Sequence, residues 1–138
     1  MEVTVTFSRF SPASRRVLRA AEQECRNLNH YYVGVEHLLL GLLAERNESV
    51  EARLRGRGIV PGDIYLELRK RLGTGEDRVW QGILVTPRAR RVVERAGQML
   101  AAEVLIEPID LFEAICMEEG GLTAELSFRR AFIAAGAV

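Results

Sequence analysis

An internal repeat constrains the fold of this chain more than any other feature of its sequence. The segment TPRARRVVERAGQML, which begins at Thr86, aligns with SPASRRVLRAAEQEC, which begins at Ser11, at an offset of 75 residues. Six of the fifteen aligned positions are identical: Pro12/Pro87, Arg15/Arg90, Arg16/Arg91, Val17/Val92, Ala21/Ala96 and Gln23/Gln98. A unit of this size cannot bury its apolar faces alone. We therefore expect two copies that pack against each other about a pseudo-twofold axis.

Each copy opens with the start signal of an α-helix. A hydroxyl side chain stands before a proline at Ser11-Pro12 and again at Thr86-Pro87. The hydroxyl can cap free backbone amides, and a proline at the first helical position costs no hydrogen bond. In the first copy the apolar positions follow helical spacing at Val17, Leu18, Ala21, Cys25 and Leu28. This pattern predicts a helix that fades between Asn27 and His30.

The next segment, VEHLLLGLLAE, predicts a helix from Val35 or Glu36 to about Glu45. Its leucines cover nearly every face, which is typical of a central, buried helix. We expect a short third helix capped by Ser49 and ending at residues 56–58. A fourth helix is expected to begin at Pro61, with Ile64, Leu68 and Leu72 on one face.

The second copy continues with the same pattern once one residue is dropped, so that Glu36 aligns with Asp110 and Leu38 with Phe112. A third helix of this copy is expected from about Thr123 to Ala135. The chain ends where a counterpart of the Pro61 helix would begin. The predicted fold is all-α, a tandem pseudo-twofold repeat of a helical unit of 75 residues. About seven helices are expected, and the second repeat lacks its last helix.

The expected organisation is an extended arm or strand at residues 1–9 followed by a single domain at residues 10–138. That domain divides into repeat one at 10–72, a glycine-rich linker at 73–85 with Trp80 as a lid on the core or an exposed anchor, and repeat two at 86–138. The arm, through Val3, Val5 and Phe7, is expected to fill the groove left by the missing helix. It would do so in the same chain, giving a monomer, or in a neighbour, giving a weak dimer.

Composition excludes several classes of function. Nineteen basic residues balance nineteen acidic ones, so no net field holds nucleic acid or an anionic membrane. No apolar run is long enough to span a membrane. Cys25 and Cys116 lie in apolar helical patterns and are read as free thiols of a reducing compartment, which favours the cytoplasm. Cys25, His30, His37 and Cys116 show no zinc spacing, so neither a metal nor a cofactor is expected.

Three stretches, FSPASRRVLRAAEQE, VGVEHLLLGLL and ILVTPRARRVVERA, resemble the N-terminal domain of Clp-type protein-unfolding ATPases, in particular ClpC and ClpA. The resemblance covers residues 10–136 and weakens from Ala101 onward. It implies a helical, non-catalytic recognition module that receives adaptor proteins or substrate segments for the ATPase ring. No Gly-Lys-Ser/Thr phosphate loop is present. The chain is therefore expected to be either an excised front end or a free-standing accessory relative.

The resemblance also implies a binding role for Glu36 and Asp110. In ClpC-type domains the matching glutamates bind phosphoarginine tags, the carboxylate taking the guanidinium. Here Val35 and Ile109 stand where ClpC domains often carry threonine, so phosphoarginine is an alternative and not the main expectation. The structural alternative is that Glu36 only offsets the dipole at a helix start. The functional reading requires it to point outward and pair with an arginine-like group of a partner.

Other candidate residues leave further alternatives open. His37 is expected to hydrogen-bond the preceding loop and fix its angle, close to the partner site. Arg15 and Arg16, with Arg88, Arg90 and Arg91 in the second copy, form either a solvated face or the rim of a site for an acidic partner. A rival function is a helical nucleic-acid-binding or regulatory domain that uses these arginine clusters. A third alternative is an enzyme, which would require Glu36, His37 and Asp110 to converge.

Overall fold

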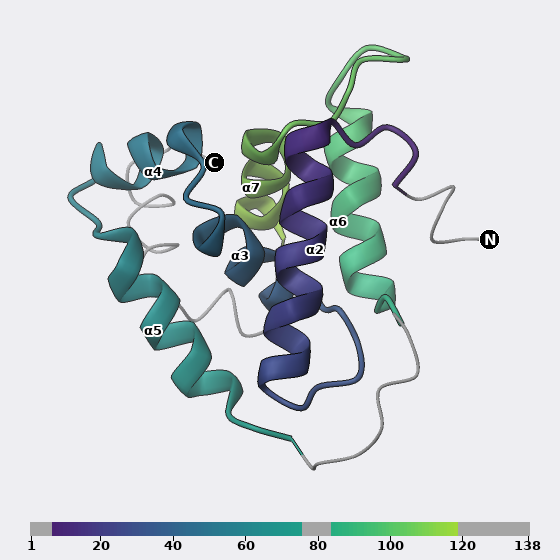
Figure 1. Ribbon diagram of the computed structural model, residues 1–138. Helices are drawn as coiled ribbons and strands as arrows, with labels where there is room; N and C mark the ends of the chain where they lie inside the picture. The colour runs from purple at the N-terminus through teal and green to yellow at the C-terminus, as the bar shows by residue number, and fades with distance from the viewer. Residues whose placement is uncertain (1–6, 76–83, 119–138) are drawn as a thin grey trace.

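The computed structural model describes residues 7–75 and 84–118. Within these ranges the chain forms six α-helices and no strand. They are α2 (Pro12–Asn27), α3 (Val35–Ala44), α4 (Glu48–Arg55), α5 (Pro61–Leu72), α6 (Pro87–Gln98) and α7 (Pro108–Met117). The helices gather around α3, with α2 and α6 upright and α5 slanting away below α4 (Figure 1). The expected all-α fold is confirmed. The expected helix from Thr123, the linker around Trp80 and the arm residues 1–6 lie outside the described ranges.

The two repeated helix starts form as predicted. The Ser11 hydroxyl accepts a hydrogen bond from the Ser14 amide at 3.1 Å, and the Thr86 hydroxyl accepts one from the Ala89 amide at 3.1 Å. Each cap is followed by a proline at the first helical position. Helix α4 differs from expectation, because its cap is the side chain of Asn47, which accepts from the Val50 amide at 3.2 Å. The prediction that Ser49 caps this helix is wrong.

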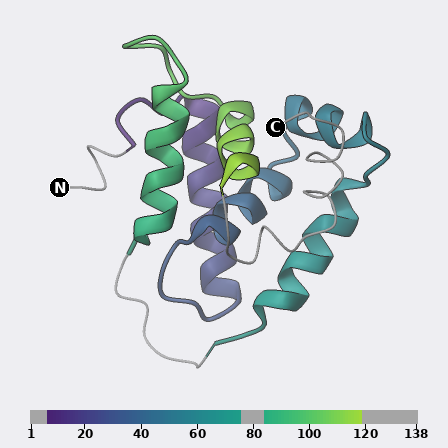
Figure 2. The ribbon, with the colours of Figure 1, turned by 180° about the vertical axis from the view of Figure 1, so that it is seen from behind.

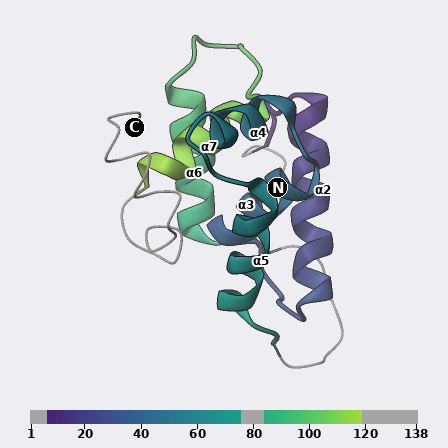
Figure 3. The ribbon, with the colours of Figure 1, turned by 90° about the vertical axis from the view of Figure 1, so that its left-hand side faces the viewer.

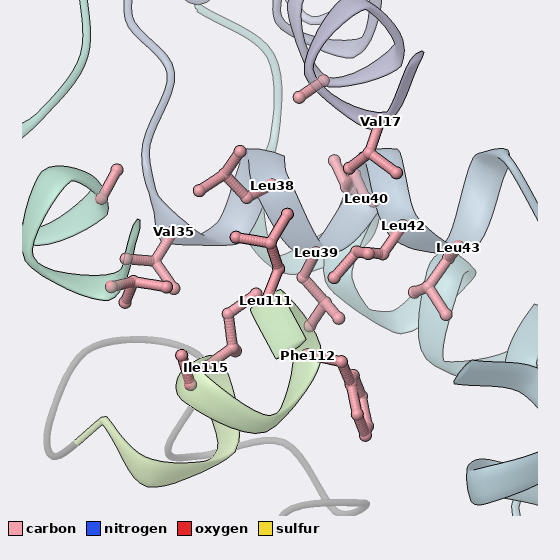
Figure 4. Close-up of a cluster of buried hydrophobic side chains, with 14 of the residues drawn as sticks. Val17, Val35, Leu38, Leu39, Leu40, Leu42, Leu43, Leu111, Phe112 and Ile115 are labelled. Atoms are coloured by element: carbon pink, nitrogen blue, oxygen red, sulfur yellow. The ribbon is translucent and has the colours of Figure 1, made fainter. Parts of the chain in front are cut away.

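Helix α3 is the centre of the core, as its sequence predicts. Every residue from Val35 to Leu43 is buried. Its leucines contact side chains of α2 and α7, including Val17, Leu111 and Phe112, and Figure 4 shows these groups around the helix. Each buried leucine stabilises the fold by roughly 2 kcal/mol relative to an exposed one. Because α3 offers no polar face, it depends on neighbours from both halves of the chain.

Helices α2 and α3 approach closely at Gly41. A Cβ atom built on this glycine would lie 2.5 Å from the Val17 carbonyl oxygen and 2.9 Å from the Ala21 amide nitrogen. Both are backbone atoms, which cannot move without shifting α2. The absence of a side chain at Gly41 therefore sets the distance between the two most extensively packed helices.

Two short bridges join the halves of the chain in a crossed manner. Phe10, just before α2, pairs in parallel with Ile106, just before α7, and Val85, just before α6, pairs with Val33, just before α3. The Ile106 amide donates to the Arg9 carbonyl at 2.7 Å. In the other bridge the Val33 amide donates to the Leu84 carbonyl at 2.6 Å. Exchanging the two halves converts one bridge into the other, as a pseudo-twofold arrangement requires. The duplication itself stays a prediction.

The arm also contributes at its described end. Phe7 is buried, with its ring centroid 4.9 Å from that of Phe10. The Arg9 guanidinium donates to the carbonyls of Gly97, Ala101 and Val104 at 2.8–3.1 Å. These bonds hold the loop between α6 and α7, which projects beyond the helices and is seen from behind in Figure 2.

We predict that Gly41→Ala destabilises the protein by about 2–4 kcal/mol, because its Cβ collides with the backbone of α2. The matched control is Gly62→Ala, at which a Cβ has no heavy atom within 4 Å. This control is expected to change stability by less than about 1 kcal/mol. Urea unfolding of the three proteins measures the difference. Equal midpoints for the two variants would show that the α2–α3 contact does not limit stability.

Candidate functional site

A cluster of three charged side chains lies where the two halves of the chain meet. Arg88, at the start of α6, forms two bonds with Glu118, from Nε to Oε2 at 2.7 Å and from Nη2 to Oε1 at 2.9 Å. Its Nη2 also lies 3.3 Å from Oε2 of Glu36 on α3. The hydrogen bond to Glu118, with the charges of both carboxylates, raises the pKa of Arg88. A cation in the first turn of a helix is unfavourable, and the two carboxylates offset that cost.

Of the two alternatives for Glu36, the structure contradicts the one in which its carboxylate points outward to a partner. Its side chain is 9% exposed and pairs with Arg88 of the same chain. The physical reason lies far away in sequence, since the guanidinium that matches this carboxylate comes from the second half of the chain. Glu36 is consequently the buried member of an ion pair within the chain.

His37 lies beneath the surface in a buried pair with His30. The Gly34 amide donates to His37 Nδ1 at 3.0 Å, and His37 Nε2 lies 2.7 Å from His30 Nδ1. Because Nδ1 of His37 accepts, its Nε2 carries the proton and donates to His30. The predicted bond from His37 to the preceding loop is thus present. Tyr32 packs on both rings, stacked on His30 at 5.9 Å between centroids and edge-on to His37 at 5.3 Å.

Burial is the main cause of the low basicity of this pair. It lowers the pKa of His37 to about 4, with a further contribution from His30. Burial also lowers the pKa of His30. Nearby, Cys25 donates its thiol to the Tyr32 carbonyl at 3.0 Å, and burial raises its pKa to about 12. The expectation that Cys25 and Cys116 are free thiols is confirmed.

Asp110 occupies a different register from the one expected. It is the third residue of α7, and its carboxylate accepts the Glu107 amide at 2.9 Å. This is the bond that His37 makes with Gly34 at the third position of α3. Helix starts therefore align Asp110 with His37, so the expected match between Asp110 and Glu36 is wrong by one residue. No hydrogen bond among the described residues joins Glu36, His37 and Asp110, as an enzyme built on them would need.

The predicted arginine clusters lie at opposite ends of two antiparallel helices, because α2 begins at the top of Figure 1 and α6 at the bottom. Arg15 and Arg16 are exposed, and Arg16 lies 3.6 Å from Glu45. Arg91 is exposed, whereas Arg90 is partly buried. The structure thus separates the two clusters instead of combining them into one surface.

Beside the charged cluster lies a groove between α6 and the end of α7, with a volume of about 390 Å³. We call it the arginine groove; its lining residues are Arg88, Arg91, Val92, Arg95, Met117 and Glu118. The sequence reasoning missed Arg95 and the role of Glu118. The spacing of Arg88, Arg91 and Arg95 by three and seven residues places them on one helical face, and this signal was readable in the sequence.

A second polar network also escaped sequence reasoning. Glu24 on α2 is buried and accepts from the Tyr65 hydroxyl at 2.6 Å and from Arg69 Nη1 at 2.6 Å. Both partners lie on α5, so this network fastens α5 to α2. Among the residues described, no group of three or more histidine, cysteine, aspartate or glutamate side chains is placed to hold a metal ion. None of the described helices is long and apolar enough to cross a membrane.

Comparison with known proteins assigns the fold. The family model described as Clp repeat (R) N-terminal domain matches residues 9–126. The chain belongs to the Clp N-terminal domain family. A solved structure of the N-terminal domain of the chaperone ClpD from Arabidopsis thaliana superposes with a TM-score of 0.61. The alignment covers 94% of this chain and 86% of that one at 20% identity, which shows a shared fold.

Sequence relatives of this Clp N-terminal domain include much longer proteins. A ClpA homolog from Cyanidium caldarium is 37% identical over 90 residues, which are 65% of this chain and 10% of that protein. The chloroplastic chaperone protein ClpC1 of Arabidopsis thaliana is 38% identical over 92 residues, which are 67% of this chain and 10% of that protein. The chain thus spans about a tenth of the length of these relatives.

We predict that stability falls as pH decreases from 6.5 towards 4. The folded pKa of His37 is about 4, below the ordinary value of 6.5, so the unfolded chain takes up the proton first. The stabilisation is complete above pH 6.5 and lost below it, by on the order of 3 kcal/mol. His30 acts in the same direction. Denaturant unfolding at several pH values measures this slope, and His37→Asn should flatten it. An unchanged slope in the variant would assign the pH dependence to other groups.

We predict that Arg88→Met destabilises the protein by about 1–3 kcal/mol, because the Glu36 carboxylate is left buried without its partner. Adding Glu36→Gln to this variant should recover part of the loss, since the uncompensated charge is removed. Thermal unfolding of the single and double variants forms the test. Additive losses in the double variant would mean that the two side chains do not interact.

Proposed function

We propose that this Clp N-terminal domain is a non-catalytic recognition module that docks an adaptor protein or a substrate segment for a Clp-type chaperone or protease in the cytoplasm. Membership of the Clp N-terminal domain family supports the association with a Clp-type chaperone or protease. The observation that carries the proposal is which polar side chains are buried and which are exposed. Glu36, His37 and Glu24 are buried in internal bonds, whereas Arg15, Arg16 and Arg91 stay at the surface. Such a distribution suits docking of a protein surface.

The predicted site residues take two different roles in this proposal. Arg15, Arg16, Arg90 and Arg91 would meet the partner directly. Glu36 and His37 would act indirectly, because both are buried. Glu36 would fix the position of Arg88, and His37 would fix the loop before α3. Asp110 is partly exposed at the start of α7 and would border the docking surface.

Phosphoarginine recognition at Glu36 carries a specific cost in this chain. The carboxylate already pairs with the Arg88 guanidinium, so the guanidinium of a tag would have to displace that side chain. Arg88 is also held by two bonds to Glu118. We therefore favour a partner that docks on the exposed arginines over a phosphoarginine tag bound at Glu36.

The test is affinity capture with the immobilised chain from a lysate of its own organism, followed by identification of the bound proteins. We expect a Clp ATPase subunit, an adaptor or a substrate of the protease to be retained. Retention should be lost in a variant with Arg15→Glu, Arg16→Glu, Arg90→Glu and Arg91→Glu. It should persist in the control Arg55→Glu, which reverses an exposed arginine of α4.

Recovery of none of these protein classes by the wild-type chain would contradict the proposal. The rival nucleic-acid function is tested separately by gel mobility of DNA and RNA with the chain at low salt. Unchanged mobility removes that rival, and a shift that the four-arginine variant abolishes would favour it.

A further inference from the structure

The arginine groove carries more positive charge than its internal contacts use. Arg88 is neutralised by Glu118 and Glu36, at 2.7 and 3.3 Å. Arg95 donates from Nη1 to the Met117 carbonyl oxygen at 3.0 Å. Because this carbonyl is neutral, the bond does not balance the positive charge of Arg95. Arg91 lines the same groove, and within residues 7–75 and 84–118 no carboxylate lies within ion-pair distance of it. Two guanidinium charges one helical turn apart are thus left without a counter-charge in the described part of the groove.

Like charges at this spacing destabilise a helix by a few tenths of a kcal/mol. The fold does not require them at these positions. At the offset of 75 residues, the positions of the first copy that align with Arg88, Arg91 and Arg95 are Ala13, Arg16 and Ala20. Helix α2 nevertheless packs on α3 as α6 packs on α7. The three arginines on this face of α6 are therefore not needed for the helix to pack in this way.

The groove is also partly apolar. Val92 is 3% exposed and forms part of the lining, while Met117, which also lines the groove, is 40% exposed. A partner that fits these features would present carboxylates to Arg91 and Arg95 and an apolar side chain to Met117. Helices α6 and α7, which carry these residues, pack against each other (Figure 3).

We propose that the arginine groove binds a short acidic segment of a protein partner, in which carboxylates alternate with apolar side chains. This inference rests on the proposed function, because it names the chemistry of the partner that the recognition module takes. Guanidinium groups match carboxylates as two-pronged donors, and complementary charge accelerates association and selects among partners. Two internal carboxylates, Glu36 and Glu118, lie against Arg88, which lines the same groove. They disfavour a continuous phosphate backbone, which places nucleic acid second.

The test uses fluorescence anisotropy of a labelled peptide built from repeated Glu-Glu-Leu triplets, with the full chain. The matched peptide replaces every glutamate with glutamine and keeps the leucines. We expect saturable binding of the acidic peptide that weakens as salt is raised, and no saturable binding of the glutamine peptide. The variant with Arg91→Ala and Arg95→Ala is expected to bind the acidic peptide about fivefold to tenfold more weakly.

Controls separate the groove from general basicity. Arg55→Ala removes an exposed arginine of α4, which does not line the arginine groove, and should bind the acidic peptide like the wild type. Circular dichroism melts of the variants check that each is folded. Equal binding of the two peptides, or an unchanged affinity of the double variant, would overturn the proposal.

The outcome is distinguishable from failure of the proposed function. If the chain captures a Clp component but the double variant captures it equally well, the recognition function stands and the groove assignment is wrong. If the acidic peptide binds in the groove but no Clp component is captured, the groove is an acidic-segment site and the proposed function is wrong.

Discussion

A helix without a polar face can exist in water only when other parts of the chain surround it, and α3 is such a helix. Its buried residues run without interruption from Val35 to Leu43. Helices α2, α4 and α5 of the first half and α6 and α7 of the second half all contact it. The apolar surface of α3 is thus the reason that the two halves form one core. It also explains why small changes such as a Cβ at Gly41 are expected to be costly.

The crossed bridges turn this shared core into a fixed geometry. Each of the two helices that carry a hydroxyl cap is preceded by a residue that pairs with the other half. This pairing brings the start of α6 beside the start of α3, where Arg88 meets Glu36. The contact between Arg88 and Glu36 is consequently a product of the interface between the halves. The arginine groove next to it is lined by residues of the second half.

Local signals in the sequence predicted the elements well. Caps, prolines and the spacing of apolar residues depend on neighbours within a few positions, and they located α2, α3, α5 and α6 correctly. Where two local signals competed, at Asn47 and Ser49, the sequence did not decide, because both side chains can cap a helix. The register of α7 failed for a related reason. Matching carboxylates by residue type favoured Glu36 with Asp110, whereas the capping bond places Asp110 with His37.

The candidate site was harder to predict because its contacts join distant residues. Glu36 and Arg88 are 52 positions apart, and the Glu24 network joins α2 to residues 41 and 45 positions away. Nothing in the sequence near Glu36 shows that its counter-charge is internal. The partnership of His30 and His37 also arises only when the loop between α2 and α3 folds back. The family resemblance located the region of interest and could not show which side chains stay exposed in it.

Native-state hydrogen exchange tests most directly whether the halves depend on each other. The amides of Ser11, Val33, Thr86 and Ile106 all lie outside the helices, and each donates across the boundary between the halves. If α3 is stable only when both halves surround it, these four amides should exchange as slowly as the central amides of α3, through global unfolding. Fast exchange at Thr86 and Ile106, with α3 still protected, would show that the second half opens on its own and would contradict the account.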